Sequence, residues 1–314
     1  MDANEQFLKD VLNGLSDKPK HLDSKYFYND NGDRLFQEIC NLPEYYLTRA
    51  ERNIFEHQWE DILNIFSDNG LSFNLIELGS GDGSKTRELI GNFLKKQKNF
   101  VYTPIDISPD ILHQLELAFK EDFPRLKIDC APGDYFVALH ALNNSICDKK
   151  VILFLGSTIG NYNYDDAVLF LKSIHKELNP GDMILTGFDL KKDPYVILQA
   201  YNDKHGITRK FNLNLLHRIN SELHADIDVD AFYHYPTYNP ASGEAKSYLI
   251  SERDQSVTIH GKTVFFARHE SVFMEVSRKF SLEEIESMAR DSGFKVVTHL
   301  FDENQYFTDS IWKV

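Results

Sequence analysis

Residues 73–86 constrain the fold of this chain more than any other stretch. An apolar run of strand-like composition reaches the acidic Glu77, and glycines then alternate at Gly79, Gly81 and Gly83 before a helix start. Glycines at a strand-to-helix turn let the backbone approach a ligand closely and adopt conformations that a side chain would forbid. The pattern predicts the first βαβ unit of a nucleoside-binding domain. The alternative is a tight turn that binds no ligand.

A second strand, residues 102–106, ends at Asp106, whose carboxylate can accept hydrogen bonds from ribose hydroxyls. The glycine spacing, G-x-G-x-G, differs from the G-x-G-x-x-G of dinucleotide-binding turns. Glu77, together with Asp134 and Tyr135 after a third strand, favours S-adenosylmethionine, because a carboxylate can hold the α-ammonium group of that ligand. We therefore expect an adenosyl cofactor.

Charge and hydropathy limit the classes of partner. The 314-residue chain carries a formal net charge of −14, whereas binding a polyanion needs a clustered basic face. No run of about 18 apolar residues is present, so no membrane span is expected. Residues 1–5 are acidic and polar, unlike a signal peptide. We expect a cytoplasmic monomer that binds a small molecule, with neither nucleic acid nor membrane as partner.

The cysteines add no chemistry. Cys40, Cys130 and Cys147 are scattered along the chain and form neither a disulfide framework nor a metal-ligand spacing. We expect them to be reduced core residues, and we expect no metal site.

Strand and helix patterns alternate over residues 72–190, which is typical of a doubly wound, mostly parallel α/β sheet. The strongly apolar residues 150–155 predict a strand buried on both faces. Asn161 follows this strand, at the carboxyl end where open α/β sheets bind ligands. A turn-capping asparagine is the alternative. Two strand-like segments after the last helix predict the antiparallel final hairpin that methyltransferase sheets carry and NAD-binding sheets lack.

The remaining segments lie outside the expected cofactor domain. We expect residues 1–62 to be helical, and residues 195–279 to be an α+β insertion with a hairpin, too long for a loop and part of a second lobe. Residues 63–194 form the expected cofactor domain. Residues 280–314 return to that domain, and their helix opens at Ser281 with a capping box.

From about residue 25 to its end, the chain resembles the histidine-specific, S-adenosylmethionine-dependent Nα-methyltransferases, which make histidine betaine (hercynine) for ergothioneine synthesis. The matching strings occur in the same order as in that family. They are residues 27–28 (FY), 42–51 (LPEYYLTRAE), 77–81 (ELGSG), 85–87 (KTR), 154–161 (FLGSTIGN), 189–193 (DLKKD), 200–201 (AY), 211–214 (FNLN) and 275–280 (EVSRKF).

The resemblance implies that residues 1–62 and 195–279 together form an α+β substrate-binding lobe, and it implies a role for each matching residue. The cofactor-binding residues implied are Glu77, Gly79, Ser80, Gly81 and Lys85 at the methionine portion, Asp106 at the ribose, and Asp134 and Tyr135 at the adenine. The substrate-binding residues implied are Tyr28, Tyr46, Asn161 and Tyr201 around the α-amino and carboxylate groups, with Glu275 and Ser277 at the imidazole ring. Without the resemblance, we would interpret Glu275 as an exposed strand carboxylate, and the tyrosines as packed hydrophobic residues or a lid.

The chemistry suits these residue types. Methyl transfer is an in-line displacement at a sulfonium carbon, so alignment and exclusion of water can supply most of the rate. The attacking amine must be neutral, and the nearby sulfonium charge disfavours its ammonium form. Tyr28 and Asn161 are the expected catalytic residues, because their polar groups can orient the lone pair of the amine. Neither a metal nor a cysteine nucleophile is needed.

One departure from the family concerns specificity. Family members usually carry a methionine next to the imidazole, and the matching string here places Ser247 at that position. A smaller, polar side chain makes another amino acid, such as a tryptophan or tyrosine derivative, a credible substrate. Two further hypotheses are a nucleoside-binding protein without catalysis and an NAD-dependent dehydrogenase. The retained Tyr and Asn set disfavours the former, and the glycine spacing disfavours the latter.

Overall fold

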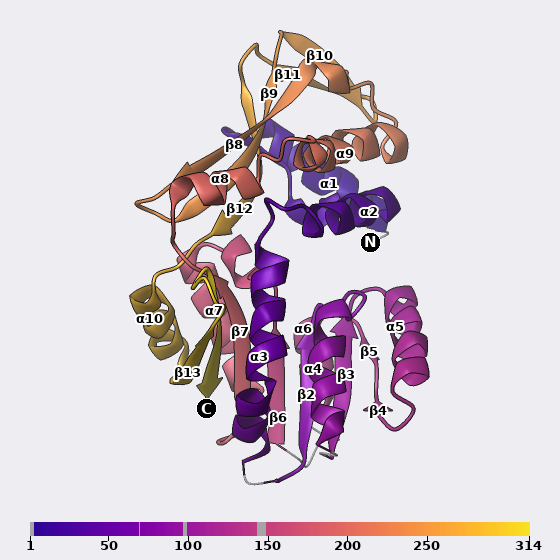
Figure 1. Ribbon diagram of the computed structural model, residues 1–314. Coiled ribbons are helices and arrows are strands. Elements are labelled where there is room, and N and C mark those ends of the chain that lie inside the picture. Colours follow the sequence, from indigo (N-terminus) through magenta and orange to yellow (C-terminus); the bar gives the residue numbers. More distant parts are fainter. Residues whose placement is uncertain (1–2, 69, 97–98, 143–148) are drawn as a thin grey trace. The chain divides into compact units, whose positions relative to one another are not determined.

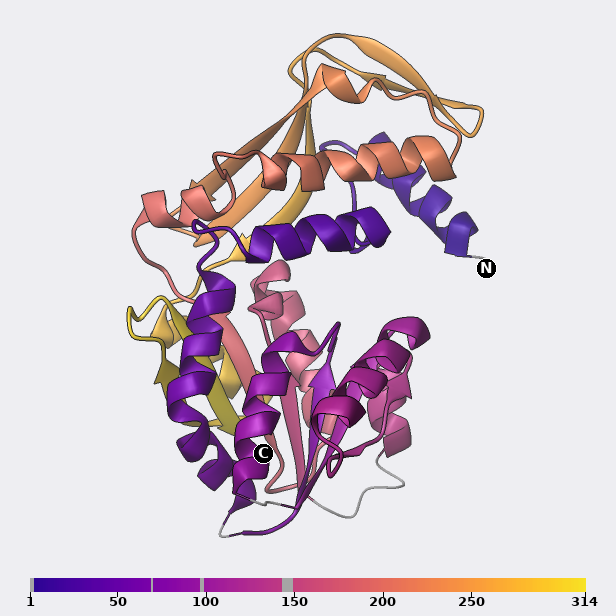
Figure 2. The ribbon, with the colours of Figure 1, turned by 45° about the vertical axis from the view of Figure 1, so that its right-hand side comes forward.

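A computed structural model describes residues 3–68, 70–96, 99–142 and 149–314 (Figures 1 and 2). The chain separates into two compact units, each assembled from distant parts of the sequence. The first unit comprises Met1–Tyr46 and Lys192–Arg278, and the second comprises Leu47–Lys191 and Lys279–Val314. No helix in the described part of the chain is long and apolar enough to cross a membrane.

The second unit contains a mostly parallel sheet with strand order β13-β14-β7-β6-β2-β3-β4, and β5 also pairs with β3. Its strands are β2 (Phe73–Leu78), β3 (Phe100–Asp106), β4 (Lys127–Ile128), β5 (Ala131–Pro132), β6 (Lys149–Phe154), β7 (Met183–Asp189), β13 (Lys295–Phe301) and β14 (Phe307–Lys313). The last two strands form an antiparallel pair, and β14 also runs antiparallel to β7. The doubly wound sheet and its final hairpin are as predicted.

Helices cover both faces of this sheet (Figure 1). They are α3 (Leu47–Ser67), α4 (Ser84–Lys95), α5 (Pro109–Asp122), α6 (Tyr135–Leu142), α7 (Tyr164–Lys176) and α10 (Leu282–Ser292), with the 3₁₀ turn η2 (Thr158–Asn161) after β6. Side chains of α3, α4 and α5 form one buried apolar layer, and those of α6, α7 and α10 form the other. Central strands buried on both faces explain the continuous apolar runs in the sequence.

The first unit is built on a smaller sheet with strand order β1-β12-β9-β8, in which β9 is antiparallel to both β12 and β8. Its elements are α1 (Ala3–Ser16), β1 (Lys20–His21), η1 (Ser24–Phe27), α2 (Asp30–Cys40), α8 (Pro194–Ala200), α9 (Ile207–Glu222), η3 (Val229–Ala231), β8 (Phe232–Asn239), β9 (Glu244–Ser251), β10 (Gln255–Ile259), β11 (Lys262–Phe266) and β12 (Ser271–Arg278). A separate apolar core includes Phe27, Phe211 and Phe232. The hairpin β10–β11 turns at His260 and Gly261, as its sequence predicts.

The first boundary between the units differs from the expected one. The expected substrate lobe includes residues 1–62, whereas the compact units divide between Tyr46 and Leu47. The reason is the packing of α3, because Ile54, Phe55 and Ile62 are fully buried in the core of the second unit. The other two boundaries lie close to the expected positions, at residues 191–192 and 278–279.

A buried ion pair joins two distant parts of the second unit. The Lys279 ammonium lies 2.8 Å from the Asp189 carboxylate, and both side chains have no exposed surface. The adjoining backbone is also paired, because Phe280 donates its N–H to the Asp189 carbonyl, and Leu190 forms a bridge with Phe280. These contacts fix the end of β7 against the segment that leads into α10.

Replacing one partner of this pair should destabilise the protein strongly. We expect Lys279→Met to lower the free energy of unfolding by about 3–5 kcal/mol, because an uncompensated carboxylate remains buried. Chemical denaturation followed by circular dichroism measures the change. The double variant Asp189→Asn/Lys279→Met is the control, and it should recover much of the loss. A single variant as stable as the wild type would contradict the expectation.

Candidate functional site

The glycine turn after β2 adopts backbone conformations that favour glycine. Gly79, Gly81 and Gly83 have φ angles of 69°, 52° and 67°, all in the left-handed region. A Cβ on Gly79 would lie 2.6 Å from the Tyr135 hydroxyl, so the absent side chain leaves room for that phenol. The turn is held by Asp106, whose Oδ2 accepts the Gly81 N–H at 3.1 Å. Asp106, which we predict to bind the ribose, therefore also shapes the turn.

Glu77 lies at the end of β2 and is almost fully buried. Its Oε1 accepts a hydrogen bond from the Thr86 hydroxyl at 2.6 Å, and its Oε2 accepts one from the Tyr102 hydroxyl. Burial raises the pKa of Glu77 to about 7, and the two hydroxyl donors oppose that rise. The carboxyl group is therefore poised to gain or lose a proton near neutral pH.

The other predicted cofactor residues lie on neighbouring loops. The Asp134 carboxylate is exposed and accepts the Phe136 and Val137 N–H groups at the start of α6. Burial, followed by the charge of Asp106, raises the pKa of Tyr135 to about 12, so its phenol stays protonated. The Ser80 hydroxyl is buried and has no hydrogen-bond partner among the described residues. A buried polar group without a partner is suited to receive one from a ligand.

These loops meet because of the strand order. β2 pairs with β6 on one side and with β3 on the other, and all three run parallel. Their carboxyl ends carry the glycine turn, Asp106 and Asn161 at one edge of the sheet. The chain leaves β2 toward β3 and later returns to β6, so the order reverses here. Open α/β sheets bind ligands at such a reversal.

Asn161 lies at the end of η2, and its side chain is exposed. Within the described residues its amide makes no hydrogen bond that would cap the turn. Ser157, which precedes η2, is buried with a left-handed φ of 57°. The turn therefore presents Asn161 outward from the carboxyl end of β6, and a role toward the substrate stays a prediction.

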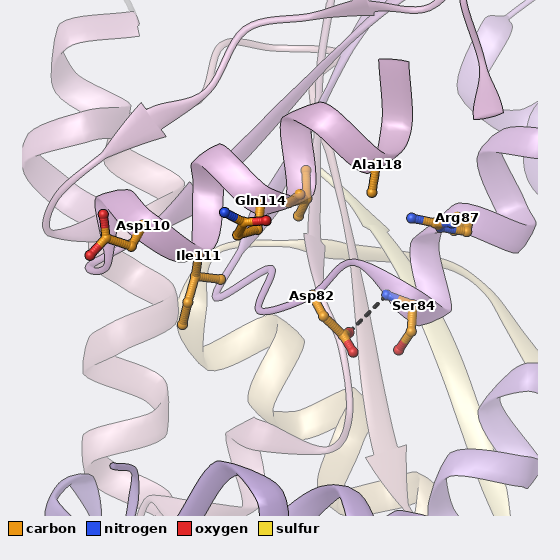
Figure 3. A pocket seen from close by; sticks show the side chains of 8 residues that line it. Asp82, Ser84, Arg87, Asp110, Ile111, Gln114 and Ala118 are labelled. Carbon is orange, nitrogen blue, oxygen red and sulfur yellow. Dashed lines mark hydrogen bonds between the residues drawn. The ribbon is translucent and has the colours of Figure 1, made fainter. Parts of the chain in front are cut away.

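A cavity of 660 Å³ lies beside the glycine turn, between the start of α4 and α5 (Figure 3). Its lining residues are Asp82, Ser84, Arg87, Asp110, Ile111, Gln114, Leu115 and Ala118. The Asp82 carboxylate accepts the Ser84 N–H at 3.0 Å, which closes the end of the turn. The predicted cofactor residues do not line this cavity. The candidate cofactor site therefore lies at the strand ends and not in this cavity.

The predicted imidazole-binding residues share one face of the sheet in the first unit. Glu275 on β12 lies directly opposite Ser247 on β9, and Ser277 lies opposite Ala245. Residues opposite each other in adjacent strands project from the same face. The Tyr201 hydroxyl donates a hydrogen bond to the Ser277 oxygen at 2.8 Å. Glu275, Ser277, Ser247 and Tyr201 are thus brought together from three separate segments.

His234 on β8 extends this group and was not predicted from the sequence. Its Nε2 lies 3.1 Å from the Ser247 hydroxyl oxygen. Burial lowers the pKa of His234 to about 4, so its imidazole is neutral at physiological pH. The Ser247 hydroxyl therefore has a partner within the protein, on the same sheet face as Glu275.

Tyrosines surround the same group. The Tyr28 ring contacts Phe36 and Phe211 edge-on, and the Tyr45 ring contacts Tyr201 edge-on with centroids 6.5 Å apart. Desolvation by packed neighbours raises the pKa of Tyr28 and of Tyr45 well above the usual value, and the negative charge of Glu275 adds to the rise for both. Both phenols therefore stay protonated and can donate hydrogen bonds.

The structure brings Tyr45 into this cluster, whereas its neighbour Tyr46 is the residue that the family resemblance implies. The Tyr46 hydroxyl accepts a hydrogen bond from the Lys192 ammonium at 2.8 Å, and that ammonium also lies 4.4 Å from the centre of the Tyr46 ring. Both tyrosines belong to the string that carries the family resemblance, so the sequence signal was present but did not distinguish them. A substrate role for Tyr46 stays a prediction.

Among the described residues, no group of three or more His, Cys, Asp or Glu side chains could hold a metal ion. Cys40 and Cys130 are half-buried, and Cys147 lies outside the described residues.

Comparisons with known proteins agree with this geometry. A family model described as "Histidine-specific methyltransferase, SAM-dependent" matches residues 7–314. A histidine N-alpha-methyltransferase of Mycolicibacterium smegmatis is 34% identical over 295 residues, covering 93% of this chain and 90% of that protein. A second, from Mycobacterium tuberculosis, is 33% identical and covers 94% and 91% of the two chains. An L-tryptophan methyltransferase of Psilocybe serbica is 26% identical, covering 90% and 86%.

The raised pKa of Glu77 predicts a pH-dependent stability difference from Glu77→Gln. The pKa of Glu77 is about 7 in the folded protein and 4.5 ordinarily, so between these pH values the folded protein binds a proton that the unfolded chain does not. The contribution of Glu77 to the free energy of unfolding therefore decreases as the pH rises through this interval. We expect the free energy of unfolding of the wild type to fall, relative to that of the variant, by on the order of 1–3 kcal/mol over this interval. Denaturant titrations of both ligand-free proteins from about pH 4 to about pH 8 measure it. A difference independent of pH would contradict the assignment.

Proposed function

Because the chain belongs to the histidine-specific, S-adenosylmethionine-dependent methyltransferases, we propose that it methylates the α-amine of free L-histidine, toward the trimethylated betaine hercynine. The observation that carries this proposal is the cluster of Glu275, Ser277 and Tyr201 with protonated phenols beside it. A protein that only binds a nucleoside needs no such second-substrate group. The donor is S-adenosylmethionine, which supplies an electrophilic methyl group on a sulfonium.

We propose that the strand ends of the second unit hold that donor. The left-handed glycine turn and the buried Ser80 hydroxyl fit the methionine portion, with Lys85 as a partner for its carboxylate. The half-buried Asp106 carboxylate is placed to accept ribose hydroxyls. Ile107, the next residue, is 82% exposed, and an adenine ring would cover such an apolar side chain. Asp134 and Tyr135 remain the proposed residues on the adenine side.

We propose that Glu275 and Ser277 distinguish imidazole from other rings. A carboxylate can accept a hydrogen bond from one ring N–H, and a hydroxyl can serve the second nitrogen. The Tyr201 hydrogen bond fixes the Ser277 oxygen in place, so the hydroxyl is held on one side of the ring position that we propose. An indole has a single nitrogen and would leave one of these two polar groups without a ring partner, at a cost to its binding.

The phenols supply the polar environment of the α-amino and carboxylate groups. Tyr28 and Tyr45 stay protonated and can donate to a carboxylate or orient a neutral amine. Orienting the lone pair requires no strong base, because alignment supplies most of the rate in an in-line displacement. We further propose that the exposed amide of Asn161 contacts the substrate amine.

We also propose that the protein works as a cytoplasmic monomer without a nucleic-acid partner. The net charge of −14 supports the absence of a nucleic-acid partner.

Histidine binding should depend on Glu275. With S-adenosylhomocysteine present, we expect Glu275→Ala to weaken histidine binding by roughly tenfold or more, because a hydrogen bond to a charged group is lost. Calorimetric titration with histidine, its mono- and dimethylated forms and tryptophan measures the affinity. Glu252→Ala, an exposed acid in the loop after β9, is the matched control and should bind histidine normally.

The same titration tests the substrate. Preference for histidine and its methylated forms, lost in Glu275→Ala, supports the proposal. Tighter binding of tryptophan, or histidine binding that is indifferent to Glu275, would refute the histidine assignment and leave methylation of another amino acid as the function.

The phenol of Tyr45 should contribute more than that of an exposed tyrosine. We expect Tyr45→Phe to lower kcat/KM for histidine about 3- to 10-fold, because one hydrogen bond to the substrate is removed. Tyr235→Phe is the control, since Tyr235 is 52% exposed and its neighbour in the strand, His234, projects from the opposite face. Steady-state assays with saturating donor measure both variants. Equal rates for the three proteins would remove Tyr45 from the site.

A further inference from the structure

Glu51 is a fully buried acid in the second turn of α3 that joins the two ligand-binding loops of the second unit. Its Oε1 accepts the Gly156 N–H at 2.6 Å, at the start of the loop after β6. Its Oε2 lies 2.7 Å from the Lys85 ammonium, at the start of α4 after the glycine turn. The Glu51 carboxylate thus contacts both the segment after β2 and the loop after β6.

The neighbouring backbone makes room for this carboxylate. A Cβ on Gly187 in β7 would lie 2.6 Å from Glu51 Oε1. A Cβ on Gly156 would lie 2.8 Å from the Lys85 Nζ. Side chains at these positions would displace the carboxylate or the ammonium, so glycine at both positions preserves the arrangement.

The loop that Glu51 holds contains two successive left-handed residues. Gly156 has a φ of 73° and Ser157 a φ of 57°, and for serine this conformation is unfavourable. The Ser157 hydroxyl accepts the Asp189 N–H at 3.0 Å. The turn is therefore held at Gly156 by Glu51 and at Ser157 by the end of β7. It leads directly into η2 and Asn161.

A second buried acid, Asp309 on β14, lies near Glu51. Asp309 is fully buried, and neither of its carboxyl oxygens has a hydrogen-bond partner among the described residues. Burial, followed by the negative charge of Glu51, raises the pKa of Asp309 well above its usual value. Burial therefore favours the protonated form of Asp309, whereas Glu51 lies against the Lys85 ammonium.

We propose that Glu51 is a positioning residue that fixes the Lys85 ammonium for the carboxylate of the methyl donor and holds the turn that presents Asn161. The inference rests on the proposed function through the role given to Lys85. An ammonium already oriented by a buried carboxylate loses little freedom when the ligand binds. The same carboxylate links the loop after β2 to the loop after β6.

The test compares single and double variants. Glu51→Gln keeps an oxygen for the Gly156 N–H and removes the charge that orients Lys85. We expect it to weaken S-adenosylhomocysteine binding about tenfold and to raise KM for the donor, with little change in KM for histidine. Asp309→Asn is the matched control, because burial favours the protonated form of this neighbouring acid and the amide has the same shape. It should change the affinity less than about twofold.

Positioning also predicts coupling. In a Lys85→Met background, which by itself weakens binding, Glu51→Gln should cause no further loss, because the group that it orients is gone. Calorimetric titration with S-adenosylhomocysteine measures the affinity of the wild type, of the single variants Glu51→Gln, Lys85→Met and Asp309→Asn, and of the double variant Glu51→Gln/Lys85→Met. Thermal melting checks that each of these proteins is folded. Should Glu51→Gln be unstable, Glu51→Asp serves in its place, since its shorter side chain cannot reach both partners.

Three results would overturn the inference. They are wild-type affinity in Glu51→Gln, an equal loss in Asp309→Asn, or a loss from Glu51→Gln that persists without Lys85. The proposed function has its own readout in the same preparations, namely methylation of histidine by the wild type. A wild type that binds S-adenosylhomocysteine but does not methylate histidine would refute that function. The titrations of the Glu51 variants would still decide whether Glu51 orients Lys85.

Discussion

The reversal of strand order between β2 and β6 is the constraint on which the second unit depends. At this point the chain departs to one side for β3 and later returns to the other side for β6, so the loops that follow neighbouring strands diverge. Helices cannot cover the strand ends there, and polar backbone and side chains become available to a ligand. The glycine turn, Asp106 and the turn before Asn161 are all consequences of this topology. Glu51 adds a direct link between the two diverging loops.

In the first unit, several polar groups lie close together around the proposed position of a small, highly polar amino acid. An antiparallel sheet does this economically, because directly opposed residues such as Glu275 and Ser247 share one face. Tyr201 enters from the end of α8 and fixes Ser277. Desolvation, with the negative charge of Glu275 adding to it, keeps the phenols of Tyr28 and Tyr45 protonated. The resulting cluster offers donors for a carboxylate and an acceptor for a ring N–H.

Much of this could be predicted from local sequence, and the failures have a common cause. The strands of the second unit, the capping box at Ser281 and the β10–β11 hairpin follow from apolar runs and turn residues, which are local signals. The amphipathic pattern of α3 predicts a helix but does not say which core its apolar face joins. In the same way, a string of adjacent tyrosines does not show that Tyr45 turns toward Tyr201. His234 and Glu51 were missed because an isolated histidine or helical acid is typical of a surface residue until distant strands bury it.

Buried acids are the feature that most separates this chain from a sequence selected for stability alone. Glu77, Glu51 and Asp309 all lie in the interior of one unit, and each costs free energy through desolvation. The three are compensated differently. Hydroxyl groups donate hydrogen bonds to Glu77, an ammonium lies against Glu51, and burial favours the protonated form of Asp309. Of the three, Glu51 contacts both loops, at Lys85 and at Gly156. A buried ion pair that merely stabilised the fold could be replaced, as a pair, by apolar side chains of similar volume at little cost, whereas a pair that orients Lys85 toward a ligand could not. The position of Glu51 is therefore better explained by ligand binding than by folding.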